Sequence, residues 1–493
     1  TLQRKVFFDH IGHLTLHVGK DARKEHKQNV IAYTSSLDEM KKIVIFFTYI
    51  HFFVFGALAQ SDSVDVAALK ADIKREVLAE LRAEQEAESV HKTLRDTKVS
   101  LYGFVRNYIS YDTRQCITLA GDIYNLMPMD VELNAEGEDL NAVPKTIFIA
   151  FSSRFGFDIA GPTILGAASS ANLEADFVGF SVNNMVFRVR HAYVQLAWEK
   201  SALLVGQTWH PSFQLSPTIS GYGAGAPFST SARMPQIQLK QRVGQNWHAL
   251  LSAIFQHNDS SYGPDGKTYD YARWNLWPEG YLSLKRVGEN FTFGAGVSVL
   301  SLKPRRESIA IREITAEDGT VTSEPMRVKV NDRVLGITPE LFADYHYDRF
   351  NIKGKVIYTQ NASHMQMLSG FGATAYDPAT GSYEYAPLRS LTTWLNATYG
   401  SKVRGGVLLG YIDNLGAKKD YLSTDDFWMF GAKNADYIYR IAPSVVYFAK
   451  NLEIGLEGDY TVVGYGDLAL NGRTKALRNV ANVRACLMVR YNF

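Results

Sequence analysis

The last strand-like segment, residues 482–493, constrains the fold of this chain more than any other stretch. Read in steps of two, one row is apolar and ends on an aromatic residue: Val483, Ala485, Leu487, Val489, Tyr491 and Phe493. The other row is mostly polar: Asn482, Arg484, Cys486, Met488, Arg490 and Asn492. Alternate residues of a strand face opposite sides of its sheet. A soluble sandwich would bury the apolar row, whereas a membrane barrel would turn it to lipid and the arginines to a water-filled lumen.

Strand-like segments of about ten residues, the length that crosses a bilayer at a tilt, fill the chain from Lys98 onward. We expect about sixteen of them. Their approximate ranges are 98–111, 145–159, 171–180, 186–198, 202–209, 234–243, 246–257, 272–286, 291–302, 333–347, 350–360, 386–399, 402–413, 436–449, 452–463 and 479–493.

The connections between these segments alternate between short and long. Tight polar turns are expected at 199–200, 244–245, 288–289, 348–349, 400–401 and 450–451. Long segments lie near 112–144, 210–233, 258–271, 303–332, 361–385, 414–435 and 464–478. This alternation predicts an all-β fold over residues 98–493: an antiparallel up-and-down transmembrane β-barrel of about 16 strands, with extracellular loops and both ends periplasmic.

The phase of each strand predicts which side chains face the lumen. Phe187, Val189 and Tyr193 oppose Arg188 and Arg190. Ile237, Leu239 and Val243 oppose Lys240 and Arg242 in the same way. We therefore expect a polar, charged lumen that is not filled by apolar packing and is wide enough for a channel.

Three segments precede the predicted barrel. Residues 40–59 have a basic start, an apolar run and a small-x-small ending, which is typical of a secretory signal peptide rather than an internal buried helix. Residues 1–39 are then interpreted as upstream, non-native sequence. In residues 60–97, apolar side chains recur at spacings of three and four from Val66 to Leu81, which predicts a short periplasmic amphipathic helix, either a coiled coil or a partly ordered linker.

Composition and motifs argue against several other functions. The formal net charge is +2, which does not indicate nucleic-acid binding, and the two cysteines, Cys116 and Cys486, lie far apart in sequence. The histidines at 191, 210, 248, 257, 346 and 364 lack metal-ligand spacing or a local serine partner. We expect no catalytic residue, no metal site and no cofactor.

Arginines in the strands are the predicted functional residues, because guanidinium groups bind carboxylates and phosphates and a positive field in a cleft attracts anions. The candidates are Arg106, Arg154, Arg188, Arg190, Arg242 and Arg484. Acidic loop residues such as Glu132 and Asp139 would balance the charge. Alternatively, each arginine pairs with a neighbouring acid, such as Asp158, Glu174 or Asp176, and only supports the wall. No lysine ladder is evident in the lumen-facing rows.

The segment from His210 to Arg233 is the candidate constriction. It follows the fifth predicted strand, where a porin's third extracellular loop folds inward, and it is rich in Gly, Ser and Pro. Its candidate constriction residues are Phe213, Tyr222, Phe228 and Arg233. The alternative is a loop that lies over the rim.

Four segments, taken together, resemble a known family. In order and spacing, residues 153–157, 173–179, 188–194 and 204–209 are similar to the DcaP-type trimeric outer-membrane porins. The terminal Phe493 is also typical of bacterial outer-membrane barrels. The resemblance implies a sixteen-stranded trimer with a periplasmic coiled coil and a basic constriction that favours dicarboxylates and other small anions. It makes Arg154, Arg188 and Arg190 the leading anion contacts.

The predicted function is a passive diffusion channel in the outer membrane of a Gram-negative bacterium. Its expected partners are small anionic solutes, outer-membrane lipid and two further copies of the chain, and no nucleic acid. The alternatives are an outer-membrane barrel enzyme, such as a hydrolase, and a structural or adhesion barrel with a closed lumen.

Overall fold

The computed structural model describes residues 97–181, 184–221, 223 and 225–493, together with Lys74, Arg75, Leu78, Ala79 and Arg82. The chain divides into two compact units, Thr1–Val90 and His91–Phe493. The five described positions of the first unit are α-helical. Residues 1–39, the predicted signal peptide and nearly all of the predicted periplasmic helix lie outside the described residues, so those assignments stay predictions. None of the helices in the described part has the length and apolarity needed to cross a membrane.

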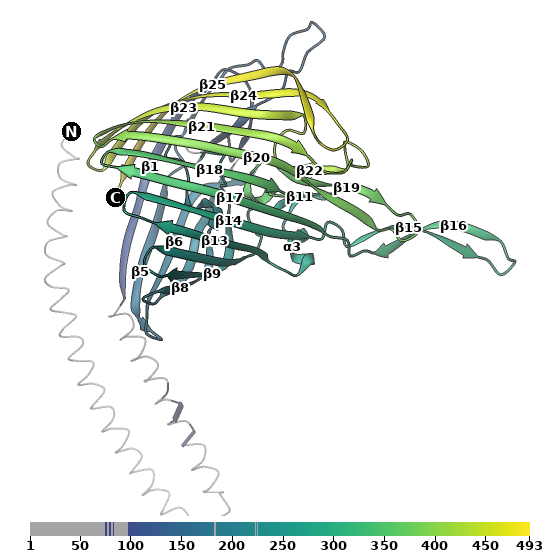
Figure 1. Ribbon diagram of the computed structural model, residues 1–493, viewed down its shortest axis with the longest axis horizontal. Helices are drawn as coiled ribbons and strands as arrows, with labels where there is room; N and C mark the ends of the chain where they lie inside the picture. Colours follow the sequence, from purple (N-terminus) through teal and green to yellow (C-terminus); the bar gives the residue numbers. More distant parts are fainter. Residues whose placement is uncertain are drawn as a thin grey trace, which may run out of the picture. The chain divides into compact units, whose positions relative to one another are not determined.

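The second unit is a closed antiparallel barrel (Figure 1). In the described part of the chain its main sheet has 19 strands, of which β19 (Gly370–Tyr376) and β22 (Phe427–Met429) extend into the loops. Two others, β4 (Lys145–Ile149) and β5 (Arg154–Ile164), share one place beside β1 (Lys98–Asp112), which leaves 16 around the ring. The remaining ring strands are β6 (Ala167–Ser181), β7 (Asn184–Ala197), β8 (Ser201–Trp209), β9 (Arg233–Val243), β10 (Trp247–Ile254), β13 (Glu279–Val287), β14 (Phe291–Leu302), β17 (Val334–Tyr347), β18 (Phe350–Gln360), β20 (Tyr383–Gly400), β21 (Val403–Gly416), β23 (Ala435–Ala449), β24 (Leu452–Leu468) and β25 (Thr474–Asn492).

The two ends of the barrel sequence close the ring. β1 pairs with β25 from Phe104 opposite Asn492 to Asp112 opposite Arg484. On its other edge β1 pairs with both β4 and β5, which are separated by a break at residues 150–153. At this break the Ser153 hydroxyl accepts a hydrogen bond of 3.1 Å from the Arg106 backbone N–H, which replaces a ladder bond. The predicted antiparallel barrel is therefore confirmed.

One predicted strand was wrong in its first half. Residues 272–278 do not extend the strand backwards from β13; instead α3 (Asp270–Asn275) begins before them and turns at Leu276, whose φ is 71°. Tyr271 of this helix is fully buried in a cluster with Leu300 and Leu302 of β14. Tyr271 packs against the end of β14 from within a helix. The alternation of residues along the segment does not show this contact, so the sequence predicted a strand there instead.

The long loops carry small elements of their own. They contain β2 (Cys116–Leu119), β3 (Tyr124–Pro128), η1 (Pro211–Gln214), β11 (Ser261–Gly263), β12 (Gly266–Thr268), β15 (Glu307–Thr315), β16 (Val321–Lys329) and η2 (Ser363–Met365). β15 and β16 form a separate hairpin that projects away from the ring (Figure 1).

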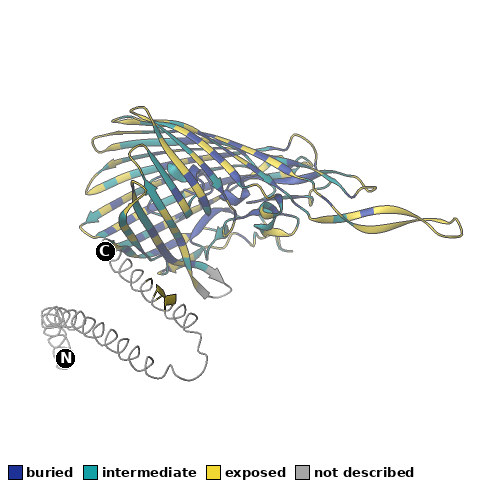
Figure 2. Ribbon diagram, turned by 90° about the horizontal axis from the view of Figure 1, so that it is seen from below, coloured by how far each residue is buried: buried dark blue, intermediate teal, exposed yellow. Residues whose placement is uncertain are grey.

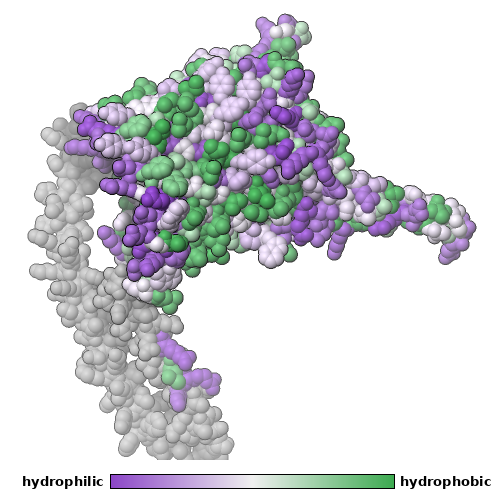
Figure 3. Space-filling view, viewed as in Figure 1, coloured by the Kyte–Doolittle hydropathy of each residue, from purple (hydrophilic) through white to green (hydrophobic). Residues whose placement is uncertain are grey.

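The outward row of the strands is apolar, as expected for contact with acyl chains. Ile237 and Leu239 are 47% and 45% exposed, and Phe187 is 54% exposed. Figure 3 shows apolar side chains across the middle of the strands and hydrophilic ones toward the ends, and Figure 2 shows the alternation of burial along the strands.

Tyr193 does not follow the predicted phase of β7. The β6–β7 register shifts so that Glu174 lies opposite His191 while Ala175 lies opposite Val189, which inserts one residue into β7. A β-bulge of this kind reverses the facing of every later side chain. Tyr193 therefore lines an internal cavity with Thr208 rather than facing lipid.

The expectation of a lumen free of apolar packing was also wrong on one side of the ring. Loop residues Leu126, Met127 and Phe228 are almost fully buried against Trp394, Ile412 and Ile438 of β20, β21 and β23. Strand phase shows which side chains point inward, but it does not show that long loops will fold inward onto them. Apolar loop packing thus covers the β20–β25 wall.

Candidate pore-lining site

The segment between β8 and β9, residues 210–232, runs inside the ring and reaches the far wall. Near its start, Ser212 donates a hydrogen bond to Glu340 of β17, and its carbonyl accepts one from Lys355 of β18. Further on, the Thr218 N–H donates to Asn396 of β20 at 2.7 Å. The strands contacted, β17, β18 and β20, are separated from β9 in the ring by β10, β13 and β14.

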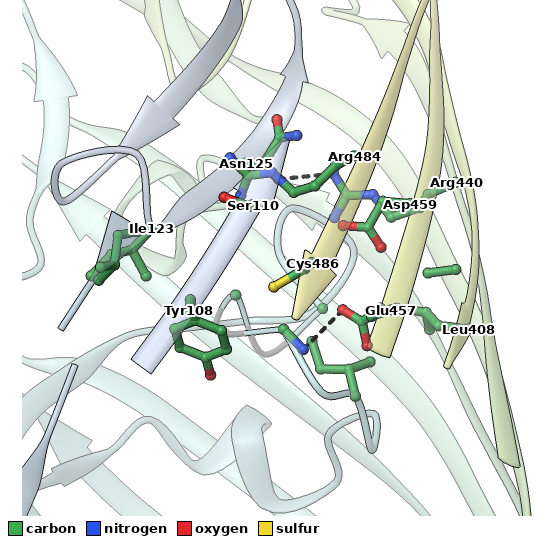
Figure 4. A pocket seen from close by; sticks show the side chains of 16 residues that line it. Tyr108, Ser110, Ile123, Asn125, Leu408, Arg440, Glu457, Asp459, Arg484 and Cys486 are labelled. Carbon is green, nitrogen blue, oxygen red and sulfur yellow. Dashed lines mark hydrogen bonds between the residues drawn. The ribbon is translucent and has the colours of Figure 1, made fainter. Parts of the chain in front are cut away.

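The tip of this segment is held by a carboxylate of β24 (Figure 4). The backbone N–H groups of Ser220 and Gly221 donate to Glu457 at 2.6 and 2.9 Å. Beside it, Arg440 donates to the carbonyl of Ala226 at 3.0 Å and to that of Asn125 in the first loop at 2.8 Å. The guanidinium charge of Arg440 makes its hydrogen bonds stronger than neutral ones, and together with the Glu457 contacts they fix both inward loops to the wall.

The predicted constriction residues fall in different places. Phe213 stacks on Trp209 with ring centroids 4.0 Å apart. Phe228 is fully buried with Arg440 5.4 Å from its ring, so it acts as an anchor. Arg233 is buried at the start of β9. Tyr222 lies outside the described residues.

Arg154, Arg188 and Arg190 come together on one patch of wall with two acids. Arg190, 2% exposed, lies 2.6 Å from Glu174 and 2.8 Å from Asp176. Arg188 donates twice to Asp176, at 3.0 and 2.9 Å, and Arg154 lies 3.5 Å from Glu174. The partners are the acids of β6, which is the alternative that the sequence left open.

The other predicted arginines are dispersed. Arg484 pairs with Asp112 at 2.9 and 2.8 Å, where β1 meets β25. Arg242 lies 3.6 Å from Glu199 at an exposed turn. Arg106 lies over the rings of Phe104 and Tyr108 at 4.6 and 5.2 Å. The acidic first-loop residue Asp139 pairs with Arg114 at 3.1 Å and so compensates a loop arginine instead of a strand arginine.

Arg233 differs from this group. Its guanidinium lies 4.3 Å from the centroid of Trp209, and its Nη1 has no hydrogen-bond partner among the described residues. Its backbone N–H donates to Asp259 at 2.8 Å, and among the described residues its side chain forms no salt bridge. Arg233 therefore places a positive charge at the first residue of β9.

Sequence analysis placed Lys240 in a polar row but did not single it out as a functional residue, and it missed Lys285. A cavity of about 360 Å³ adjoins β7, β8, β9, β10 and β13, and Lys240, His248 and Lys285 line it. No carboxylate is among its lining residues in the described chain, and neither lysine makes a described hydrogen bond or ion pair. In the register His248 lies opposite Lys285, and Leu250 lies opposite both Lys240 and Ser283. The signal was available: both lysines occupy the polar phase of their strands.

One buried cluster has metal-ligand residue types: His210, Glu279 and His364, whose ligand atoms lie within 4.8 Å of one another. Each histidine Nε2 contacts a Glu279 oxygen, at 3.1 and 2.9 Å. However, the Ser212 N–H donates to His210 Nδ1, so a neutral His210 carries its proton on Nε2 and has no lone pair there for a metal. The cluster is better explained as structural: Glu279 of β13 is hydrogen-bonded to His210 of the inward segment and to His364 of η2, which holds the three elements together.

Comparisons with known proteins agree with the barrel fold. A family model described as the DcaP outer membrane protein matches residues 78–254. Among solved structures, the chain is similar to the outer membrane channel DcaP of Acinetobacter baumannii, with 17% identity and a TM-score of 0.56, covering 81% of this chain and 98% of that one. At this identity the likeness shows the fold alone.

More distant likenesses carry no argument of their own. They include OmpT of Vibrio cholerae, with 12% identity, a TM-score of 0.45 and coverage of 80% and 99%. Salmonella typhi OmpF in complex with daunomycin gives 12% identity, a TM-score of 0.45 and coverage of 81% and 98%. The search of curated proteins gave no significant match. The resemblance to the DcaP family is thus confirmed over residues 78–254, and the chain has the barrel fold of a solved outer-membrane channel and belongs in the Gram-negative outer membrane.

Proposed function

We propose that the channel conducts passively and prefers small anions, such as dicarboxylates. The observation that carries this proposal is the pair Lys240 and Lys285, which line the internal cavity without an acidic partner in the described chain. An uncompensated positive field between low-dielectric walls concentrates anions and speeds their entry. Arg233 adds a further guanidinium without an ion pair among the described residues.

The arginines predicted from sequence have a different part in this proposal. Arg154, Arg188 and Arg190 form ion pairs with Glu174 and Asp176, so most of their positive charge is compensated within the barrel wall. The inward segment narrows the passage and presents Phe213 beside the lysines. Selectivity then rests mainly on the lysines, with the arginine patch as a secondary contact.

Reversal potentials in planar bilayers under a KCl gradient test the proposal. The unmodified protein should prefer chloride, and the double variant Lys240→Glu with Lys285→Glu should move the preference toward potassium. Lys450→Glu, at an exposed turn between β23 and β24, is the matched control and should change little. A cation preference of the unmodified channel would contradict the proposal.

Apolar loop packing on the β20–β25 wall favours one competing function, a barrel with a closed lumen that serves a structural or adhesive role. Swelling of liposomes that contain the protein separates the two. Small solutes enter through a channel and produce swelling, whereas a closed barrel gives none.

We also propose that the barrel assembles as a trimer. Phe155, Phe177 and Phe187 form a cluster on the outer row of β5, β6 and β7, with ring centroids 6.1 to 6.3 Å apart. Phe177 and Phe187 are 41% and 54% exposed, so a neighbouring copy of the chain has apolar and aromatic surface here to pack against. The mass of the detergent-solubilised protein, measured by light scattering, should equal three chains.

A further inference from the structure

The cavity that holds the two lysines also presents aromatic rings. Trp209 and Phe213 lie almost parallel, with an interplanar angle of 20° and centroids 4.0 Å apart, and Tyr193 lines the cavity with them. Trp209 is already engaged by Phe213 and by Arg233. Phe213 shares that stack but has no described cation over its ring, so Phe213 and Tyr193 are the rings that can still receive a ligand.

These rings are fixed by the backbone on both sides of the cavity. Phe213 is in η1, where the Ser212 N–H donates to the His210 ring and the Ser212 carbonyl accepts from Lys355. Tyr193 is turned inward by the bulge in β7. Rings that are held in place before a ligand arrives lose little conformational entropy on binding.

The cationic groups face the same space. Lys240 is exposed to the cavity and Lys285 is partly exposed, while His248 lies between them on β10. The described lining residues include no carboxylate, and they include the amides of Gln195 and Gln238 and the hydroxyl of Ser283. A ligand with a planar ring and a negative charge matches this wall, whereas a cation would meet repulsion and find no acid.

We propose that this cavity is a subsite for small aromatic carboxylates, which stack on Phe213 and place the carboxylate on Lys240 and Lys285. The inference rests on the proposed anion preference and narrows its substrate class. About 360 Å³ is within the usual range for small-molecule sites. An aromatic pair contributes about 0.5–1.5 kcal/mol beyond area burial, which corresponds to roughly a two- to tenfold gain in affinity.

Block of the chloride current by two ring-bearing monoanions tests the subsite: benzoate and cyclohexanecarboxylate. They carry the same charge and a six-membered ring, but only benzoate is aromatic. For the unmodified channel we expect half-block at a benzoate concentration roughly two- to tenfold lower than for cyclohexanecarboxylate. If the subsite selected by apolar area alone, cyclohexanecarboxylate would block equally well or better, and that result would overturn the inference.

Two variants separate the contributions of ring and charge. Phe213→Leu should bring the ratio of the two half-block concentrations to about one, whereas Lys240→Gln with Lys285→Gln should weaken both blockers and keep the ratio. The second variant alters only accessible side chains, so it tests the charge contact even if the first does not fold. Lys450→Gln should leave both concentrations unchanged.

The outcomes distinguish this inference from the proposed function. A channel that prefers chloride but does not discriminate between the two probes retains the proposed function and loses the subsite. A channel that prefers potassium loses both. A ratio that persists in Phe213→Leu would also refute the stacking contact.

Discussion

The substitution Asp112→Asn should destabilise the barrel at the place where the chain closes on itself. Asp112 is fully buried and accepts two hydrogen bonds from Arg484, whose side chain is 7% exposed. It also accepts from Asn125 of the first loop and from Asn482 of β25, each at 3.0 Å. One carboxylate therefore joins β1, β25 and the first inward loop.

The expected loss follows from what remains after the substitution. Removing one partner of a buried pair costs about 3–5 kcal/mol, because the other charge is left uncompensated. Here Asp459 lies opposite Arg484 in the β24–β25 register, so a second acidic residue remains beside the guanidinium. Asparagine also keeps one acceptor oxygen. We therefore expect a loss of about 3 kcal/mol, at the lower end of that range.

Urea-induced unfolding in detergent micelles, followed by tryptophan fluorescence, measures this loss. The matched control is Glu384→Gln, which removes the charge from the pair with Lys419 at 2.7 Å, where both side chains are more than 60% exposed. Water screens such a pair, so the control should show almost no change. Equal effects of the two substitutions would refute the view that burial of the Asp112–Arg484 pair, rather than its presence, stabilises the ring closure.

Three other predictions concern the loops. Gly410→Ala would place a Cβ 2.5 Å from the Phe228 ring, so overpacking should lower the free energy of unfolding by about 1–3 kcal/mol, measured by the same urea titration. Burial raises the pKa of the Cys116 thiol to about 12, so at pH 8 it stays protonated and should react with maleimide only after denaturation, as mass spectrometry would detect. Replacing residues 307–329 with a short Gly-Ser link should leave the channel conductance unchanged. The two ends of the hairpin are already close, because the Val330 N–H donates a hydrogen bond of 3.1 Å to the Arg306 carbonyl. An altered conductance would show that the hairpin contributes to the passage.

The sequence by itself determined the barrel. The barrel follows from local properties that each strand and its connections show independently. These are the alternation of apolar and polar residues with a period of two, the strand length, and the alternation of short turns with long loops. The predicted segments 291–302, 350–360 and 234–243 match β14, β18 and β9 to within one residue. A lipid-facing row must be apolar along its whole length, so this signal repeats in every strand and tolerates an error in any one of them.

Only the tertiary structure decided how the lumen is lined. Tyr193 faces inward because of a single inserted residue in β7, and no local pattern announces such a bulge. Arg188 and Arg190 belong to the polar row of β7, yet their charge is balanced by Asp176 and Glu174, which belong to a different strand. Lys240 and Lys285 acquire their significance only when register brings β9, β10 and β13 together without an acid. Where no bulge intervenes, the facing of a side chain follows from its position along the strand, whereas net charge and packing inside a closed ring are set by residues far apart in sequence.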